Sequence, residues 1–425
     1  MKRVVVTGMG VASAVGLGIE AFWQRVLAGQ SAVAPIRGFD VADFPTQIGA
    51  EIELSAVEAF LTPKVSARLS RISKFACYAA RQAIADAVGA GNGLNPDAGV
   101  FIGCSQGGYV ESEPFFNKHF AKKAVSPFAI LKPMNSAPAT NVSIQCNLHG
   151  PVITIDTACS SANHAIGLAT MMIQSGHLTQ AVVGGVDTAF SPAVFHNWCA
   201  LYAMTRQNGV PPQACKPFSK DRDGTVLGEG AGMVVLESAA HALARGAPIY
   251  GEIAGYGQSG DAFHLTQTNA DGLTAAMTHA LRQANVAPEQ VDYINAHATG
   301  TLANDAAETA AIKQVFGEQA YAIPVSGVKP ILGHTLAASA ALELIICLLA
   351  LRDGVIPPTI NYSEADPDCD LDYVTEGARA KPLHTCLSNS FGFGGSNAVL
   401  VIKQYAHEPE DRHGSGNGKS PADCL

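Results

Sequence analysis

Short apolar runs that suit buried β-strands alternate with longer stretches of helical periodicity along most of the chain. This alternation predicts an α/β fold. Glycine clusters at the ends of several strand candidates, where tight turns are common. The strand candidates are Arg3–Thr7, Gly99–Ile102, Val152–Ile155, Ala181–Gly184, Gly232–Glu237, Tyr293–Asn295, Ile323–Ser326 and Val399–Lys403.

The same plan of strand, turn and small-residue helix occurs twice. It runs from Val152 to Gln174 and returns from Ile323 to Gly354, where His334 takes the place that Cys159 holds in the first copy. We therefore predict two pseudo-symmetric halves, residues 1–245 and 246–406, whose corresponding helix starts converge on a single site. Residues 407–425 are polar and rich in Gly, Ser and Pro, which predicts a disordered tail.

Composition narrows the class of protein. The chain has 425 residues, 48% of them hydrophobic and 15% charged, which is ample for a large core. The net charge of −9 argues against a nucleic-acid partner. No apolar stretch reaches membrane-spanning length, and the first run is broken by Thr7 and Gly8, so we expect neither a membrane span nor a signal peptide. Ten cysteines without a C-x-x-C pair suggest free thiols in the cytoplasm.

Cys159 stands out among the cysteines because it joins a predicted strand to a predicted helix. The strand is Val152–Ile155, and the helix begins near Ser160 and ends at Gly176. Unpaired backbone N–H groups and the helix dipole favour a thiolate at such a position. Cys159 is therefore a candidate nucleophile.

Three further segments carry candidate chemistry. Asn295–Thr301 (NAHATGT) and Gly327–Thr335 (GVKPILGHT) each place a histidine on a turn of small residues after a strand, where open α/β sheets bind ligands. Ser388–Asn397 (SNSFGFGGSN) interleaves Gly, Ser and Asn with two Phe residues. This last segment suits an oxyanion hole with a movable aromatic gate, or alternatively a Gly-rich hairpin.

These segments, in this order and spacing, resemble the β-ketoacyl-acyl-carrier-protein synthases of the thiolase superfamily, which elongate fatty acids and type II polyketides. The resemblance runs from Lys2 to Gln404, and Pro217–Glu237 also matches a family stretch. It implies the thiolase fold, a five-layered αβαβα architecture with two pseudo-symmetric halves. It also implies decarboxylative Claisen condensation of a Cys-bound acyl chain with malonyl-acyl carrier protein.

The resemblance assigns roles to the catalytic residues. Cys159 accepts the acyl group, and the backbone N–H groups of Cys159 and Phe393 form the oxyanion hole. His297 and His334 donate hydrogen bonds to the enolate that decarboxylation leaves, and which of them acts as a base, if either does, stays open. Lys329 supports the site electrostatically.

Supporting residues follow from the same likeness. Glu343 matches a glutamate that pairs with Lys329, and Asp305 and Glu308 match acidic positions that we interpret as structural. Thr299 and Thr301 match threonines that bind the pantetheine arm. We expect no cofactor and no metal in the chemistry, because substrates arrive on the phosphopantetheine of acyl carrier protein. Family members can also hold a structural monovalent cation, at positions that match Asn295, Glu343, Ser388 and Asn389.

Two positions depart from the family pattern. The usual H-G-T becomes His297-Ala298-Thr299, and the added methyl is tolerable if the backbone there is not at positive φ. Gln106 occupies a position where related enzymes carry an apolar residue lining the acyl pocket. A buried amide suits a saturated chain poorly, so we expect a polar, unsaturated or keto-bearing chain. Together with the unusual stretch His196–Gln207, this favours polyene or polyketide assembly over fatty-acid elongation.

A basic helix face is the candidate docking surface for acidic carrier protein. A helix is expected to open at Thr62, as N-cap, and Pro63, with an apolar stripe through Val65, Leu69 and Ile72. The flank of this helix carries four cations that we expect to be unpaired, and a basic pair follows further along the chain. These docking candidates are Lys64, Arg68, Arg71, Lys74, Lys122 and Lys123.

Alternative functions remain at this point. Gly103–Gly107 (GCSQG) matches the G-x-S-x-G elbow of serine hydrolases, with Ser105 as nucleophile, but no HGGG-type motif precedes it. A non-catalytic chain-length subunit is a second alternative, although such subunits lack the nucleophile that Cys159 provides. A housekeeping fatty-acid synthase is a third. Family likeness implies either a homodimer or a heterodimer with a chain-length-factor-like subunit.

Overall fold

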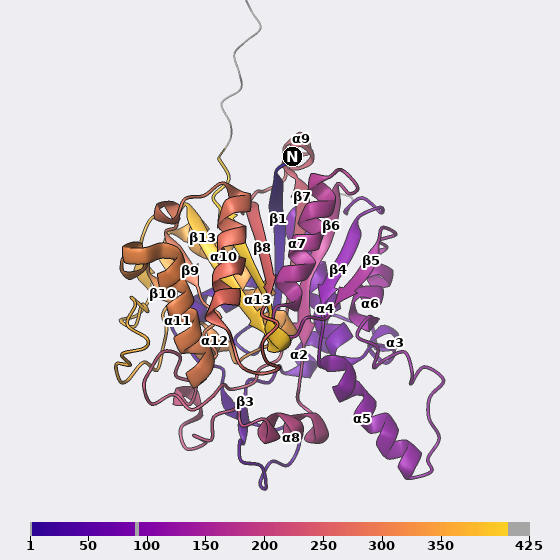
Figure 1. Ribbon diagram of the computed structural model, residues 1–425. Helices are drawn as coiled ribbons and strands as arrows, with labels where there is room; N and C mark the ends of the chain where they lie inside the picture. Colours follow the sequence, from indigo (N-terminus) through magenta and orange to yellow (C-terminus); the bar gives the residue numbers. More distant parts are fainter. Residues whose placement is uncertain (1, 90–92, 407–425) are drawn as a thin grey trace, which may run out of the picture.

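The structure, a computed structural model, describes residues 2–89 and 93–406 (Figure 1). The predicted tail, 407–425, lies outside these residues. The main sheet has the strand order β10-β9-β13-β14-β8-β1-β7-β6-β4-β5. Its N-terminal strands are β1 (Val4–Ser13), β4 (Gly99–Gly103), β5 (Val152–Ile155), β6 (Gln180–Asp187) and β7 (Gly230–Ser238). Its C-terminal strands are β8 (Gly251–Gly260), β9 (Tyr293–Asn295), β10 (Val325–Ser326), β13 (Thr385–Gly392) and β14 (Ser396–Lys403).

The strand order divides into two matching halves. The order β5-β4-β6-β7-β1 in the first half corresponds to β10-β9-β13-β14-β8 in the second. In each half three parallel strands are followed by two antiparallel pairings. The halves meet where β1 pairs with β8, at Val5–Glu252 and Val6–Gly251. The pseudo-symmetry expected from the repeated pattern is therefore present in the pairing itself.

Helices form three layers around the two halves of the sheet. The central helices α7 (Ser161–Gln174) and α13 (Ser339–Asp353) contact each other and strands of both halves. The outer helix α4 (Arg71–Val88) covers β1 and β7, and α10 (Ala270–Ala284) covers β8 and β14 on the other side. Figure 1 shows α7 and α13 in the middle of the molecule. This arrangement is the five-layered αβαβα thiolase fold, as predicted.

The central position of α13 explains its composition. Every residue from Ser339 to Leu351 is buried, so the helix has no polar face to present to water. Glu343 is the one carboxylate in this buried run. Burying a charge is costly unless it is paired, so its partner is part of the site described below.

The remaining helices flank these layers, except that α12 (Lys329–Leu332) is buried. Figure 1 shows α5 (Gly107–Phe120) projecting from the body of the molecule, with a loop that returns toward α3 and α6. The other helices are α1 (Ile19–Leu27), α2 (Leu54–Glu58), α3 (Pro63–Ser66), α6 (Ala137–Cys146), α8 (Pro192–Ala200), α9 (Ala239–Ala244), α11 (Leu302–Phe316) and α12 (Lys329–Leu332). Short strands β2 (Ala34–Pro35), β3 (Ile48–Gly49), β11 (Val355–Ile356) and β12 (Arg379–Ala380) form two small sheets.

Each strand predicted from the sequence overlaps a strand of the structure, but β8 and β13 were not predicted. β8 reads as glycine-rich and polar rather than as an apolar run. The reason is packing: a Cβ at Gly255 or Gly257 would overlap the backbone oxygens of Ala280 or Ala276 in α10. Glycine therefore lets α10 approach the strand closely.

Two expectations about the chain as a whole can be placed on the structure. Within residues 2–89 and 93–406, no helix is both long enough and apolar enough to cross a membrane. The cysteines of these ranges are all free thiols. The predicted boundary between residues 245 and 246 falls between α9 and β8 and stays a prediction.

Candidate active site

The turn between β5 and α7 presents the nucleophile. Ala158 adopts a left-handed φ of 53°, and Cys159 follows it directly. The amides of Ser160 and Ser161 donate to the carbonyl oxygens of Thr157 and Ala158, which closes the turn ahead of the helix. Cys159 is thereby held at the carboxyl end of the parallel strands with only 5% of its surface exposed.

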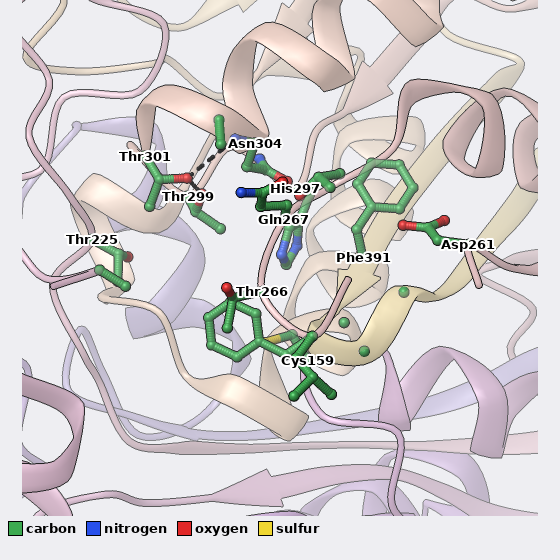
Figure 2. Close-up of a pocket in the computed structure, with 18 of the residues that line it drawn as sticks. Cys159, Thr225, Asp261, Thr266, Gln267, His297, Thr299, Thr301, Asn304 and Phe391 are labelled. Carbon is green, nitrogen blue, oxygen red and sulfur yellow. Dashed lines mark hydrogen bonds between the residues drawn. The ribbon is translucent and has the colours of Figure 1, made fainter. Parts of the chain in front are cut away.

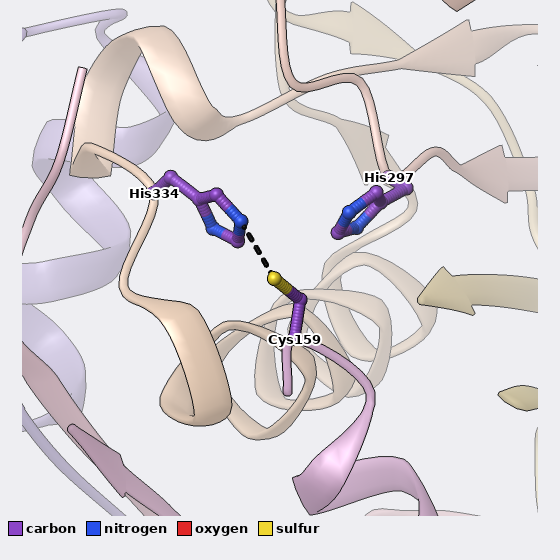
Figure 3. Close-up of side chains that lie close together, drawn as sticks. All are labelled: Cys159, His297 and His334. Atoms are coloured by element: carbon purple, nitrogen blue, oxygen red, sulfur yellow. Dashed lines mark hydrogen bonds between the residues drawn. The ribbon is translucent and has the colours of Figure 1, made fainter. Parts of the chain in front are cut away.

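The structure brings Cys159, His297 and His334 together, although they come from three distant segments (Figure 3). The Cys159 Sγ atom lies 3.1 Å from His334 Nε2. The two imidazole rings meet edge to face, with centroids 5.5 Å apart. One nitrogen of each ring and the sulfur all lie within 4.8 Å of one another. A soft metal ion such as Zn²⁺ prefers such a sulfur and nitrogen set, so thiophilic metals are expected inhibitors.

The Nδ1 atom of each ring points away from the pocket. Its hydrogen bonds determine which of the two ring nitrogens carries the proton. The Lys329 Nζ atom lies 3.3 Å from His297 Nδ1, and an ammonium can only donate. The Leu336 amide likewise donates to His334 Nδ1, at 3.4 Å. A neutral imidazole that accepts at Nδ1 carries its proton on Nε2. Both rings therefore direct an Nε2–H donor toward the pocket.

Burial keeps both imidazoles neutral. It lowers the pKa of His297 and of His334 well below the ordinary value of 6.5, and the nearby charge of Lys329 lowers both further. A neutral imidazole is a hydrogen-bond donor that carries no net charge. The pair can therefore stabilise negative charge on a substrate oxygen without giving up a proton at neutral pH.

The thiol behaves differently from the expectation. Burial raises the pKa of Cys159 to about 12, while the charge of Lys329 and the backbone amide of Phe393 act in the opposite direction. The prediction that the helix N-terminus would leave a thiolate is therefore wrong, because burial outweighs these opposing groups. The sulfur lies one residue ahead of the N-cap, Ser160, and it is more buried than the sequence suggested. Its proton must leave as the sulfur attacks.

Lys329 and Glu343 form the buried ion pair that the resemblance implied. Lys329 Nζ lies 2.6 Å from Glu343 Oε1, and each side chain is 1% exposed. The ammonium also donates to the His297 carbonyl oxygen. Burial raises the pKa of Glu343, and pairing with Lys329 opposes that rise. Lys329 thus joins the His297 turn to α13.

Asp305 and Glu308 shape the turn that carries His297. Glu308 accepts from the amides of His297 and Ala298 at 2.8 and 2.9 Å, and burial raises its pKa to about 7. Asp305 accepts from the amides of Phe218 and Gly300. Both carboxylates bind backbone rather than point into the cavity, in agreement with the structural role expected for them.

Ala298 lies at positive φ, so the condition under which the sequence analysis expected its methyl to be tolerated is not met. Its φ is 44°, in the left-handed region where glycine is usual. The methyl group is accommodated because its neighbour is Gly327: a Cβ at that glycine would overlap the Ala298 methyl. The alanine is therefore tolerated through the glycine that faces it and not through a relaxed backbone.

The predicted pantetheine residues line the catalytic cavity (Figure 2). Its volume is about 60 Å³, and Cys159, His297 and His334 lie in its wall. Thr299 and Thr301 also line it, with their hydroxyl oxygens 2.9 Å apart. Trp198 and Phe391, from segments that the sequence marked, also lie in the wall. The rest of the wall includes residues that the sequence did not single out, namely Thr225, Asp261, Thr266, Gln267 and Asn304.

The segment Ser388–Asn397 forms the hairpin of β13 and β14, and its tip carries the predicted gate. The turn η5 (Phe393–Gly395) joins the strands, with φ of 79° at Gly394 and 74° at Gly395. The Phe393 backbone amide hydrogen-bonds the Cys159 sulfur and opposes the rise of the Cys159 pKa. The hairpin and the oxyanion-hole interpretations are therefore compatible, because the first positions the second.

The predicted docking face is partly wrong. The expected helix is broken into α3, with Thr62 as its N-cap, and α4, with Ser70 as its N-cap. Arg71 binds Glu229, a buried carboxylate, and Lys74 lies 2.5 Å from Glu58. These two cations are paired within the chain. Carboxylates distant in the sequence supply the pairing, which helical spacing does not reveal.

The other docking candidates are exposed, as required for binding a partner. Lys64 and Arg68 lie on and after α3, and Lys122 and Lys123 follow α5. The structure adds Lys132, which donates to the Ala67 carbonyl oxygen and lines a surface hollow together with Arg68. Carrier docking at these residues stays a prediction.

Gln106 lies at the start of α5 and lines a second cavity of about 750 Å³. Its backbone amide donates to Asp187, a buried carboxylate whose pKa burial raises to about 7. Its neighbour Ser105 is also buried, and within the described ranges no histidine forms a hydrogen bond with the Ser105 hydroxyl. The hydrolase alternative therefore lacks its base.

The four residues implied in cation binding have the atoms that such a site needs. Oxygen atoms of Asn295, Glu343, Ser388 and Asn389 are buried without a hydrogen-bonding partner. Buried oxygens rarely lack partners in folded proteins. Hard oxygen ligands of this kind fit a monovalent cation, which would neutralise the second carboxylate oxygen of Glu343.

The comparisons agree with this geometry. The family model described as "Beta-ketoacyl synthase, N-terminal domain" matches residues 1–242, and "Beta-ketoacyl synthase, C-terminal domain" matches residues 250–363. A protein of Coxiella burnetii named "3-oxoacyl-[acyl-carrier-protein] synthase 2" is 43% identical over 95% of this chain and 99% of its own length.

Two solved structures are similar in fold and in sequence. "The ishigamide ketosynthase/chain length factor" has a TM-score of 0.87 and 35% identity, and covers 95% of this chain and 100% of its own. A type II polyketide synthase ketosynthase solved with its acyl-carrier protein has a TM-score of 0.87 and 31% identity over the same shares. The chain therefore belongs to the β-ketoacyl synthase family and is an acyl-transferring condensing enzyme.

Proposed function

We propose that this enzyme joins a Cys159-bound acyl group to malonyl-acyl carrier protein and releases β-ketoacyl-acyl carrier protein, in fatty-acid or polyketide synthesis. The observation that carries the proposal is the 3.1 Å contact between the Cys159 sulfur and His334 Nε2, with His297 beside it. A nucleophile, two neutral donors and a backbone amide at Phe393 meet in one cavity. These are the groups that acyl transfer to Cys159 and the condensation that follows it require.

Acyl transfer is the first step. The Cys159 sulfur attacks the thioester carbonyl of the carrier-bound acyl group, and the oxyanion accepts from the Cys159 and Phe393 amides. The bond from the acyl carbon to the carrier's sulfur breaks as the bond to Cys159 forms. The leaving pantetheine sulfur takes up the proton that Cys159 loses, so the exchange is neutral overall.

Condensation is the second step. The carboxylate of malonyl-carrier protein leaves as carbon dioxide, and the electron pair remains as an enolate on the thioester. The Nε2–H groups of His297 and His334 donate to the enolate oxygen. The enolate carbon then attacks the acyl-Cys159 carbonyl, the carbon–sulfur bond breaks, and the sulfur takes one proton from water.

Intact-mass measurement tests the proposal directly. The full-length enzyme is incubated with carrier proteins loaded with a panel of acyl groups. We expect a mass increase equal to the acyl group, located on Cys159 by peptide mapping, and release of the adduct as β-ketoacyl carrier protein when malonyl-carrier protein is added. Labelling at another residue, or none with any primer, would contradict the proposal.

Carrier protein is the proposed partner. Four exposed cations, Lys64, Arg68, Lys122 and Lys123, favour an acidic protein, and one similar structure holds its carrier protein. Arg68→Glu should raise the KM for carrier-bound substrate about tenfold at low salt without changing Cys159 alkylation. Arg282→Glu, an exposed cation on α10, is the matched control and should leave KM unchanged. An equal effect of both variants would exclude specific docking.

A second subunit is the other proposed partner. β5 is an edge strand of the main sheet, and Val152 in it is 41% exposed. The helices α6 and α7 both contact β5. Each carries an exposed apolar residue, Ile144 on α6 and Met171 on α7. An unpaired strand edge flanked by apolar side chains favours strand pairing with a homologous chain. Native mass spectrometry of the wild type and of Ile144→Glu distinguishes a homodimer, a heterodimer and a monomer.

A monovalent cation is proposed at the orphaned oxygens of Asn295, Glu343, Ser388 and Asn389. When bound, it would supply positive charge that stabilises Glu343 and, through it, the position of Lys329. Thermal unfolding should therefore shift upward in K⁺ or Na⁺ relative to a bulky organic cation at equal ionic strength. The same shift in an Asn389→Leu variant would contradict this site.

A further inference from the structure

The hairpin of β13 and β14 meets the start of α7 beside the nucleophile. Gly392 and Ser396 are the last residue pair of the hairpin before the turn η5. A Cβ at Gly392 would lie only 2.5 Å from the Thr157 carbonyl oxygen, so the hairpin lies directly against the turn that presents Cys159. Ser396 therefore lies where the hairpin and the nucleophile's helix are joined.

The start of α7 binds Ser396 at two points. The hydroxyl of Ser160, the N-cap residue, donates to the Ser396 carbonyl oxygen at 2.8 Å. His164 lies one helical turn further on, and its amide donates to the Ser160 carbonyl oxygen. The His164 Nε2 atom lies 3.1 Å from the Ser396 Oγ atom. Both the main chain and the side chain of Ser396 are thus bound by the helix that follows Cys159.

The imidazole of His164 is also held from its other side, by Tyr256 of β8. Its Nδ1 atom lies 2.5 Å from the Tyr256 hydroxyl oxygen, and the two rings meet edge to face with centroids 5.9 Å apart. The Tyr256 ring in turn packs on Gly167 of α7, where a Cβ would lie 2.5 Å from the ring. The imidazole therefore cannot turn away from Ser396 without losing its contact with Tyr256.

The hydrogen bonds around His164 assign its proton. The Tyr256 hydroxyl donates to the side-chain oxygen of Gln258 at 3.0 Å, and an amide oxygen can only accept. The Tyr256 oxygen then accepts from His164 Nδ1–H. A neutral imidazole that carries its proton on Nδ1 accepts at Nε2, so the Ser396 hydroxyl is the donor there. Burial lowers the pKa of His164 to about 4, so the ring is neutral at neutral pH.

The turn next to Ser396 carries the Phe393 amide, which hydrogen-bonds the Cys159 sulfur. The other two residues of this turn, Gly394 and Gly395, are glycines at positive φ. Glycine leaves the backbone more conformational freedom than any other residue. The direction of the Phe393 amide therefore depends on the contacts that hold the residues at the ends of the turn.

We infer that His164 is a positioning residue for the oxyanion hole: by binding Ser396, it keeps the Phe393 amide directed at the carbonyl oxygen of the acyl group on Cys159. The inference rests on the proposed function and adds a residue to it. His164 touches neither the sulfur nor the substrate in this arrangement. It acts through the hairpin end that it holds.

The two kinds of anion in the reaction separate this role from others. An oxyanion forms at the acyl carbonyl when the Cys159 sulfur attacks the primer, and again when the enolate attacks the acylated cysteine. Decarboxylation of the malonyl group instead develops charge on an oxygen that His297 and His334 bind. Loss of the His164 contact should therefore slow acylation and condensation but leave decarboxylation intact.

Ser396→Ala tests the inference because it removes only the hydroxyl that His164 binds. The full-length enzyme is incubated with the panel of acyl-carrier proteins, and intact mass gives the rate of Cys159 acylation at several primer concentrations. We expect the maximal rate to fall about tenfold, less than the loss of about 10²- to 10³-fold on deleting an oxyanion donor outright. The KM should not change, because primer binding is unaffected. Ser396→Thr keeps the hydroxyl and should retain the wild-type rate.

Further variants assign the effect to one hydrogen bond. His164→Leu removes the other partner of that bond and should slow acylation at least as much as Ser396→Ala. The two changes combined should be no slower than His164→Leu alone, since both break the same bond. Ser175→Ala is the matched control: its hydroxyl also contacts a histidine, with Oγ 2.8 Å from His177 Nδ1, but at the exposed far end of α7. It should leave the acylation rate unchanged.

Decarboxylation distinguishes positioning from a general structural role. Ser396→Ala combined with Cys159→Ala should release carbon dioxide from malonyl-carrier protein as fast as Cys159→Ala alone. A fall in decarboxylation that matches the fall in acylation would overturn the inference, because the variant would then disturb the whole site. Unchanged acylation in Ser396→Ala, or an equal fall in Ser175→Ala, would also overturn it. Absence of acylation of the wild type by every primer would instead overturn the proposed function.

Discussion

The two halves of the molecule bring matching strand ends to one cavity but supply different chemistry there. In the first half, β4 and β5 lead to Gln106 and Cys159; in the second, the corresponding β9 and β10 lead to His297 and the segment with His334. The first half thus provides the nucleophile and one wall of the larger cavity. The second half provides the two hydrogen-bond donors.

The charged groups that surround the catalytic turns also differ between the two halves. The second half holds the Lys329–Glu343 pair and the carboxylates that bind the His297 turn. The first half contributes Asp187, which accepts from the amides of Gln106 and, across the halves, Ala337. Pseudo-symmetry therefore determines where the turns meet, while the charges around them determine which turn does covalent chemistry and which stabilises an anion.

The largest expected effect comes from removing the nucleophile of the first half, which should leave the decarboxylation carried out by the second half intact. Cys159→Ala should reduce condensation by at least about 10³-fold, because the covalent intermediate cannot form. Decarboxylation of malonyl-carrier protein should continue, since both imidazoles belong to the other half. Intact mass measures acylation, and carbon dioxide release measures decarboxylation. Condensation that persists in Cys159→Ser would invalidate the assignment of the nucleophile.

The reciprocal change removes a donor from the second half. His297→Ala should slow decarboxylation about 10²- to 10³-fold, the usual effect of deleting one oxyanion donor. Cys159 should still be acylated, because His297 is not the imidazole that contacts the sulfur. His334→Ala should impair both steps, since its Nε2–H group lies 3.1 Å from the sulfur and can donate to the sulfur as the thiol loses its proton. Equal loss of acylation in the two variants would contradict the assignment of the sulfur contact to His334 alone.

The buried ion pair is the next test. Lys329→Met leaves Glu343 uncompensated in the core and should lower the free energy of unfolding by about 3–5 kcal/mol. Lys329→Met combined with Glu343→Leu should recover most of this stability but not the rate of decarboxylation, because His297 has lost its partner. Urea unfolding and carbon dioxide release distinguish the two effects. If the double variant recovered both the stability and the rate of decarboxylation, Lys329 would have a structural role alone.

A smaller effect is expected at the His297 turn. Gly327→Ala introduces a methyl that overlaps that of Ala298, and overpacking of this kind costs about 1–3 kcal/mol of unfolding free energy. Ala298→Gly should suppress the defect when combined with Gly327→Ala, since it removes the other methyl. Additive destabilisation in the double variant would show that the two residues do not compete for the same space.

The smallest expected change is with pH. Burial and Lys329 lower the pKa of both imidazoles well below 6.5, and an imidazole is neutral above its pKa, so the neutral range extends toward acid. The rate of malonyl decarboxylation by Cys159→Ala should therefore stay level as the pH falls through 6.5. A loss of rate centred near 6.5, in protein that remains folded, would show that the rings are not shielded as described.

Much of the catalytic site was predictable because its determinants are local. Cys159 and His297 each follow a short apolar strand on a turn of small residues, and such turns lie at the carboxyl edge of a sheet whatever the rest of the fold. His334 follows its strand, β10, only after the short helix α12, which the sequence did not predict. The resemblance then assigned Lys329 and Glu343, and the structure places them in contact. Trp198 lay in a stretch that the sequence marked as unusual, but nothing local connected it with Phe393, on whose ring it stacks.

The chain by itself determined the alternation of strands and helices, the duplication, and the residue types that meet at the turns, because these depend on local periodicity and spacing. Only the tertiary structure decided which cations stay free, since Arg71 and Lys74 find Glu229 and Glu58 across the fold. It also decided that burial dominates the thiol's pKa and that Gly327 accommodates Ala298. Burial and long-range pairing depend on elements packed from distant segments, and a linear pattern does not contain that information.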